Sequence, residues 1–153
     1  MASKSRTRAR EIALQALYQH DLAQRSKEAR PHPVELEPFI RQSSDEPEVR
    51  AYALRLYDGT LSALEGIDAQ IEAVVAHWKL ERIAAVDRSV LRMALYEILD
   101  VPDVPPKVVI NEAIELAKKY STAESGAFVN GILDRIYRQL LQAPEEPARS
   151  PRG

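Results

Sequence analysis

Two lysines, a polar turn and an aromatic residue near the end of the chain form its most chemically suggestive cluster. Lys118 and Lys119 close one expected helix, and the turn after them leads through Ser125 to the next helix. Helix N-termini present free N–H groups that bind phosphate, and Phe128 in the first turn could stack on a base. In the structural alternative, the lysines complement the helix dipole and Phe128 belongs to the core. We predict RNA contacts from Lys118, Lys119, Ser125 and Phe128.

The first ten residues form a second candidate, because they contain Lys4, Arg6, Arg8 and Arg10 and no acid. The whole chain has a net charge of −2, so the remainder carries 17 basic and 23 acidic residues, a net −6. A basic arm on an acidic body is typical of phosphate contact. The alternative is a solvated, frayed terminus. We predict that Arg6, Arg8 and Arg10, in an arm at residues 1–10, contact RNA.

Signatures of catalysis are absent from the sequence. It contains no glycine-rich phosphate loop, no Gly-x-Ser-x-Gly elbow and no His-Glu-x-x-His motif. The three histidines, His20, His32 and His77, have no second ligand at helical spacing. Glu112 and Glu115 are three residues apart but lack the histidine of a di-iron site. We therefore expect no metal, no cofactor and no enzymatic turnover.

The elements that must position these residues are predicted to be helices. Glycine is scarce, and apolar residues recur at spacings of three and four rather than alternating. Proline and polar residues mark 26–44 as a loop with a short helix near 35–41, and the tail 143–153 as disordered. Gly66 is expected to cap one helix, Asp68 to begin the next, and Gly131 to allow close helix approach. The remaining expected helices are 7–24, 47–64, 68–78, 86–99, 108–120 and 125–141.

Length and composition place these helices in one domain, predicted to span residues 1–142. The chain has 153 residues and no cysteine, which excludes disulfides and favours a reducing compartment. No apolar run approaches the roughly 18 residues that a membrane span needs, and no apolar segment of a signal peptide follows the basic start. We therefore expect an all-α cytoplasmic protein, a compact bundle of about seven helices.

Four blocks of the sequence resemble the NusB family of bacterial transcription antitermination factors. They occur in the family's order and spacing, and the resemblance covers the chain from about Arg6 to Tyr137. The blocks are Arg8-Ala-Arg-Glu-Ile-Ala-Leu-Gln-Ala-Leu-Tyr18, Val86-Asp-Arg-Ser-Val-Leu-Arg-Met-Ala-Leu-Tyr-Glu97, Val104-Pro-Pro-Lys-Val-Val-Ile-Asn-Glu-Ala-Ile-Glu-Leu-Ala-Lys118 and Phe128-Val-Asn-Gly-Ile-Leu-Asp134.

The resemblance implies a fold of two small helical subdomains and binding to single-stranded boxA RNA of nascent ribosomal RNA transcripts. It implies a heterodimer with NusE, a small-subunit ribosomal protein, within an elongation complex of RNA polymerase and other Nus factors. It leaves open a homodimer. Arg6, Arg8 and Arg10 match the family's arginine-rich start, although Thr7 interrupts the fuller run of some relatives. Phe128 matches a phenylalanine at the RNA surface, and Tyr18 and Asp87 match residues near the partner protein.

Other interpretations compete with this one. The same fold occurs as the N-terminal domain of a ribosomal RNA cytosine methyltransferase, but that enzyme needs a Rossmann-like domain that we do not expect in a chain ending at Gly153. A non-catalytic helical adaptor with incidental RNA affinity is the second alternative. For Asp87 alone, the alternative is a structural role as a dipole partner in the first turn of its helix.

Overall fold

The computed structural model describes residues 3–25, 35–75 and 80–142, and every regular element in these ranges is helical. The expected all-α fold class is confirmed. The tail 143–153, His32, His77 and Trp78 lie outside the described residues. The elements are α1 Ser3–Arg25, α2 Glu37–Gln42, α3 Pro47–Ser62, α4 Leu64–Val75, the short 3₁₀ helix η1 Leu80–Arg82, α5 Ala85–Asp100, α6 Pro106–Tyr120 and α7 Ala123–Gln142.

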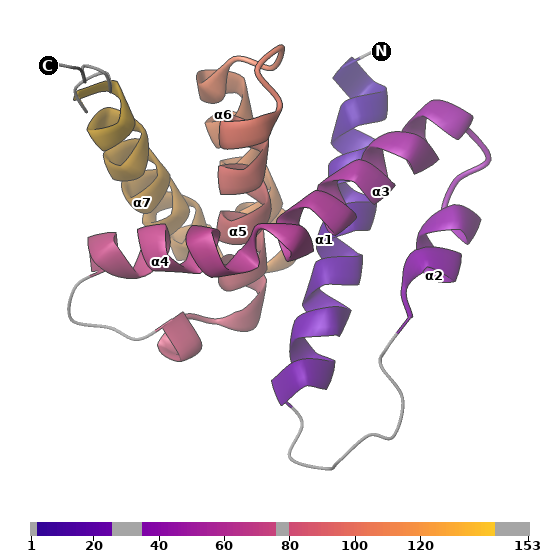
Figure 1. Ribbon diagram of the computed structural model, residues 1–153, viewed down its shortest axis with the longest axis horizontal. Coiled ribbons are helices and arrows are strands. Elements are labelled where there is room, and N and C mark those ends of the chain that lie inside the picture. Colours follow the sequence, from indigo (N-terminus) through magenta and orange to yellow (C-terminus); the bar gives the residue numbers. More distant parts are fainter. Residues whose placement is uncertain (1–2, 26–34, 76–79, 143–153) are drawn as a thin grey trace, which may run out of the picture.

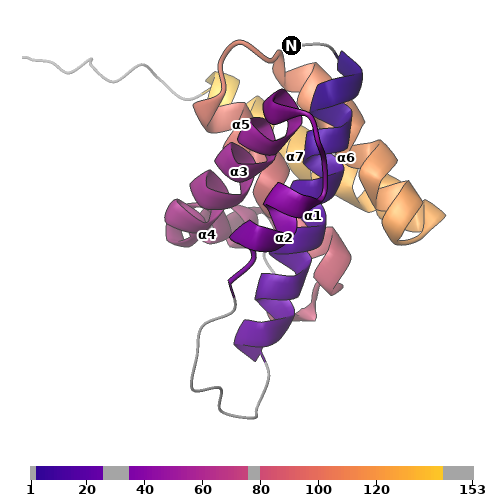
Figure 2. The ribbon, with the colours of Figure 1, turned by 90° about the vertical axis from the view of Figure 1, so that its right-hand side faces the viewer.

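Helix α5 is the centre of the packing, because it contacts α1 and α3 on one side and α4, α6 and α7 on the other. Its sequence explains this position, since every side chain from Asp87 to Glu97 is buried. Figure 1 shows α1, α2 and α3 grouped to one side and α4 to α7 to the other. After the 90° turn of Figure 2, α1 lies between α3 and α6. These two groups correspond to the two helical subdomains that the resemblance implied.

Prolines define the beginnings of two helices as the sequence predicted. Pro47 begins α3 and Pro106 begins α6, where the missing N–H of proline costs no helical hydrogen bond. The predicted inner faces of these helices are buried at Val49, Leu56 and Val109. Helix α6 ends at Tyr120, with Lys118 and Lys119 in its last turn, where cations complement the helix dipole.

Three predictions about local structure were wrong. Helix α1 begins at Ser3, four residues before the expected Thr7, so the basic residues from Lys4 to Arg10 all lie within the helix. Ala63, not Gly66, follows the end of α3, and Gly66 and Asp68 lie inside α4. A methyl group added at Gly131 would touch nothing within 4 Å, so that glycine permits no close helix contact.

Close helix approach occurs at two other glycines. A Cβ at Gly59 would lie 2.1 Å from the Tyr96 ring, so this glycine allows α3 to pack against α5. A Cβ at Gly126 would lie 2.8 Å from the Lys118 side chain, at the contact of α7 with α6. None of the helices in the described ranges has the length and apolar character needed to cross a membrane.

Candidate nucleic-acid interface

Arg10, predicted to contact RNA, is instead buried in the contact between α1 and α5. Its guanidinium donates to Glu97 at 2.8 Å from Nε and 2.6 Å from Nη2, and the Tyr52 hydroxyl donates to the same carboxylate at 2.6 Å. Burial lowers the pKa of Arg10, but the hydrogen bonds and charge of Glu97 outweigh it and leave the pKa above its ordinary value. With 4% of its side chain exposed, Arg10 is a structural residue here, which corrects the predicted arm.

Arg6 is only partly available at the surface. It donates to Asp103 at 3.0 Å and lies 5.0 Å above the centre of the Tyr52 ring. The ion pair connects α1 to the turn between α5 and α6, and 23% of the Arg6 side chain remains exposed. This arginine can therefore meet an approaching phosphate with part of its guanidinium, but it is already held in place.

Arg8 and Lys119 are two exposed cations among the predicted residues, and they share one carboxylate partner. Arg8 Nη1 donates to Glu11 Oε1 at 3.2 Å, and Lys119 Nζ donates to Glu11 Oε2 at 2.7 Å. The Arg8 and Lys119 side chains are 47% and 59% exposed, whereas Glu11 is 14% exposed. Hydrogen bonding to Glu11 raises the pKa of Lys119. The fold thus brings together two predicted cations that are 111 positions apart in the sequence.

Lys118 lies beside this pair in sequence but has a weaker partner. Its Nζ is 3.7 Å from Glu115 one turn earlier on α6, and half of its side chain is exposed. The lysine stem packs over Gly126, so the N-terminal turn of α7 lies against the end of α6. Lys118 therefore keeps an exposed ammonium next to the helix N-terminus that the sequence singled out.

One stripe of α1 continues from the basic pair to an aromatic groove. Arg8, Glu11, Gln15 and Tyr18 follow one another at spacings of three, four and three, which places them on one helix face. Gln15 and Tyr18 line a cavity of about 230 Å³ together with Leu14, Val86 and Tyr120. Lys119 lies 5.4 Å above the Tyr120 ring. The predicted partner residue Tyr18 and the predicted RNA residue Lys119 therefore belong to adjoining parts of one α1–α6 surface.

Asp87 and Ser125, predicted for different partners, contact each other. The Ser125 hydroxyl donates to Asp87 Oδ2 at 3.0 Å and lies 2.9 Å from the Ser121 hydroxyl. Both residues are buried, with 7% and 6% exposed. Asp87 lies in the first turn of α5 as expected, and its Oδ1 is buried without a hydrogen bond among the described residues. Asp87 is thus buried, and its neighbour in the sequence, Val86, lines the groove with Tyr18.

Phe128 lies at a different groove from the basic pair. It is half-buried and packs against the core, as the structural alternative predicted. Phe128 lines a cavity of about 390 Å³ between α4 and α7, together with Val75, Gly131 and Arg135. An aromatic ring and an arginine beside an open groove remain suitable for contact with a base.

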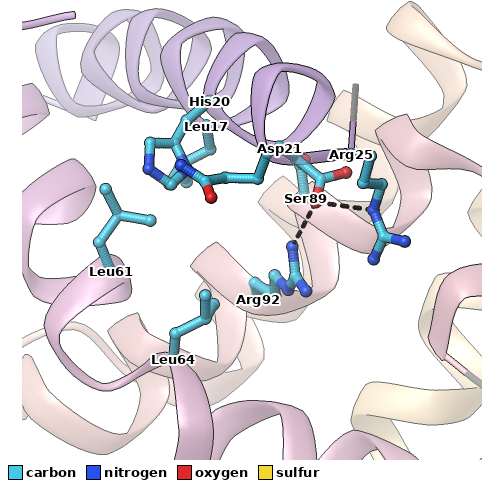
Figure 3. Close-up of a pocket in the computed structure, with 9 residues that line it drawn as sticks. Leu17, His20, Asp21, Arg25, Leu61, Leu64, Ser89 and Arg92 are labelled. Atoms are coloured by element: carbon cyan, nitrogen blue, oxygen red, sulfur yellow. Dashed lines mark hydrogen bonds and ion pairs between the residues drawn. The ribbon is translucent and has the colours of Figure 1, made fainter. Parts of the chain in front are cut away.

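A cluster of buried arginines and aspartates, which the sequence analysis missed, joins the two groups of helices. Asp21 on α1 accepts hydrogen bonds from Arg88, Arg92 and Arg25, and Arg92 also binds Asp68 of α4 at 2.8 and 2.9 Å. Burial raises the pKa of Asp21, but the arginine hydrogen bonds outweigh it and hold the pKa below its ordinary value. Figure 3 shows Asp21, Arg25 and Arg92 of this cluster lining a cavity of about 270 Å³ that Leu61 and Leu64 also line. Because the aspartate and the arginines satisfy each other, this cluster fixes α1 against α4 and α5.

The sequence analysis also missed the acidic residues that pair with the predicted arginines of α1. Glu11 lies three residues after Arg8, so their i,i+3 spacing was a detectable signal. The contacts of Glu97 with Arg10 and of Asp103 with Arg6 join residues far apart in the chain, and no local pattern announces them. In the described part of the chain, no group of three or more acidic, histidine or cysteine side chains could hold a metal ion.

Comparison with known proteins relates this chain to a family. A sequence model described as the NusB family matches residues 7–138. The transcription antitermination protein NusB of Anaeromyxobacter dehalogenans is 50% identical over 139 residues, which cover 90% of this chain and 94% of that protein. A structure of T. maritima NusB superposes with a TM-score of 0.76 at 39% identity, covering 88% of this chain and 91% of that one. A structure of antitermination factors NusB and NusE with dsRNA gives a TM-score of 0.75 at 30% identity, covering 90% and 98%.

Proposed function

The chain belongs to the NusB family, and we propose that it binds boxA RNA of nascent ribosomal RNA transcripts together with the ribosomal protein NusE. In this proposal it supports antitermination in the cytoplasm, as part of an elongation complex with RNA polymerase and other Nus factors. The α1–α6 surface is the observation that carries the proposal. It places Lys119 over the ring of Tyr120, which lines the groove together with Tyr18, and it joins Arg8 to Lys119 through Glu11.

The RNA contacts are divided between two parts of the surface in this proposal. Arg8, Lys118 and Lys119 are exposed and bind phosphates, with Arg6 contributing from its pair with Asp103. Phe128 and Arg135 offer a ring and a cation to a base at the groove between α4 and α7. Ser125 holds the α7 N-terminus in place through Asp87 and does not itself need to touch RNA.

The groove lined by Tyr18 and Tyr120 is apolar, as a protein contact is, and does not resemble a nucleotide site. Leu14, Tyr18, Val86 and Tyr120 give it an apolar floor, and its volume of about 230 Å³ suits one or two inserted side chains. Acidic residues outnumber basic ones in the remainder of the chain, so its field attracts a basic partner such as a ribosomal protein. We propose this groove as the NusE contact, with Asp87 supporting it from beneath.

A salt titration of RNA binding tests the RNA half of the proposal. We expect single-stranded boxA RNA to bind with a log K against log salt slope of roughly −1.5 to −3, because about two to four phosphates are neutralised. The related NusB–NusE structure contains dsRNA, so fluorescence anisotropy should compare the single strand, a scrambled strand and the duplex. A flat salt response would contradict the proposal and favour the adaptor alternative. A preference for the duplex would contradict a single-stranded target.

Matched variants locate the phosphate contacts. The double variant Arg8→Gln and Lys119→Gln should weaken RNA binding roughly tenfold or more, because two phosphate contacts are lost. The control is Arg41→Gln with Arg138→Gln, which removes the same charge from exposed pairs on α2 and α7. Equal losses in the two double variants would show that only net charge matters.

The NusE contact is tested separately by calorimetric titration. Tyr18→Ala should reduce heterodimer affinity by about 2 kcal/mol, as removal of a central aromatic does in protein interfaces. Thermal melts check that the variant is folded, and RNA binding by the variant alone should persist. Unchanged affinity for NusE would move the partner site away from this groove without affecting the RNA proposal.

A further inference from the structure

The cations of the proposed RNA surface already have carboxylate partners within the chain. Arg6 pairs with Asp103, Lys118 approaches Glu115, and Arg8 and Lys119 share Glu11. Glu11 is therefore different from the other two acids, because its one carboxylate holds two exposed cations, one from α1 and one from α6. Any phosphate that binds between Arg8 and Lys119 must approach this carboxylate.

The geometry gives the three groups unequal access to solvent. The two oxygens of Glu11 are divided, Oε1 to Arg8 at 3.2 Å and Oε2 to Lys119 at 2.7 Å. Only 14% of the Glu11 side chain is exposed, against 47% and 59% for the two cations. The carboxylate thus lies behind the cations, close enough to lower the positive potential that RNA meets. The trio carries a net charge of +1 instead of +2.

We propose that Glu11 sets an upper limit on RNA affinity by competing with a phosphate for Arg8 and Lys119. This inference rests on the proposed RNA-binding function and adds a residue that regulates its affinity. When RNA binds, a phosphate oxygen replaces a Glu11 oxygen as the acceptor of at least one cation. The displaced carboxylate stays nearby and repels the phosphate, so binding remains weak and reversible unless the partner protein adds contacts.

A positioning role for Glu11 would have the opposite consequence, because its loss would then release the cations and weaken binding. The structure favours competition, since each cation has a second contact that does not involve Glu11. Arg8 Nη2 reaches the Ser43 carbonyl oxygen at 3.5 Å, and Lys119 lies over the Tyr120 ring. Both residues also belong to packed helices, so their placement survives without the carboxylate.

The test is RNA binding by Glu11→Gln, which keeps the size and one hydrogen-bond acceptor of the side chain but removes its charge. We expect the variant to bind single-stranded boxA RNA about threefold to tenfold more tightly at low salt, with a salt slope steeper by about 0.7, the value for one additional phosphate on a single strand. The control Glu37→Gln removes the same charge from an exposed pair on α2 and should change affinity less than twofold. Fluorescence anisotropy across a potassium chloride series measures both quantities.

The possible outcomes separate this inference from the function on which it rests. Unchanged or weaker binding by Glu11→Gln, with normal binding by the wild type, would overturn the competition and leave the RNA-binding function intact. An equal gain in Glu37→Gln would also overturn it, because net charge alone would then explain the effect. Absence of RNA binding by the wild type would overturn both. If Glu11→Gln fails to fold, Glu11→Met, of similar length and without charge, supplies the same comparison.

Discussion

Two groups of basic residues in this chain have the same chemistry and opposite situations. Arg10, Arg88 and Arg92 are buried between helices, where Glu97, Asp21 and Asp68 satisfy them. Arg8, Lys118 and Lys119 lie at the surface, where their carboxylate partners leave half of each side chain exposed. Because a buried ion pair cannot be exchanged for a phosphate without exposing its partner acid, only the second group is suited to RNA. Depth, rather than residue type, therefore separates the structural cations from those that we propose to bind RNA.

Breaking the buried group should have the largest effect. Asp21→Ala leaves Arg88 with an uncompensated buried charge and leaves Arg92 with Asp68 alone. We expect a loss of about 3–5 kcal/mol of unfolding free energy, measured by denaturant titration. Asp134→Ala is the matched control, since it breaks the exposed Arg138 pair and should cost less than about 1 kcal/mol. Similar losses in the two variants would show that the depth of the pair is not decisive.

Acid should lower the unfolding free energy in two smaller steps, through His20 and Asp21 at the buried cluster between α1, α4 and α5. Burial lowers the pKa of His20, which lies beside Asp21 and edge-on to Tyr57, below its ordinary 6.5. The unfolded chain therefore takes up a proton there before the folded protein does, and stability falls as the pH drops below about 6.5. The depressed pKa of Asp21 has its effect lower, since its contribution is present above the ordinary 3.8 and is lost as the pH falls below that value.

Denaturant titrations between pH 7.5 and pH 3 would reveal both steps. The variant His20→Gln should remove the decline of the upper step and keep the decline of the lower one. Arg8, on the proposed RNA surface, provides the contrast, because Arg8→Gln should leave the pH profile of stability unchanged. A profile of His20→Gln identical to that of the wild type would show that His20 does not couple to folding.

The sequence predicted the helices well, but it predicted less well which of their polar residues are buried and which are exposed. Periodic apolar residues and prolines predicted α3, α5, α6 and α7 to within a few residues, because these signals are local. The basic run at Arg6, Arg8 and Arg10 was interpreted as one unit, yet the three have different environments in α1. Successive helical positions point about 100° apart, and the burial of Arg10 depends on Glu97, which lies 87 residues later. Contacts of that range have no local signature.

Two glycines show the same contrast between a packed and an open position, with smaller expected effects on stability. In Gly59→Ala the new methyl group would meet the Tyr96 ring, and we expect overpacking to cost about 1–3 kcal/mol. Gly131→Ala adds a methyl group in open space within α7, and the better helix propensity of alanine should stabilise the protein by about 0.5–1 kcal/mol. Thermal or denaturant unfolding of the two variants measures both signs. A loss of stability in Gly131→Ala would mean that α7 has a contact at this position.

Gly131 also lines the groove between α4 and α7 that contains Phe128. A folded and stabilised Gly131→Ala that binds RNA less tightly would therefore place that groove in the RNA site.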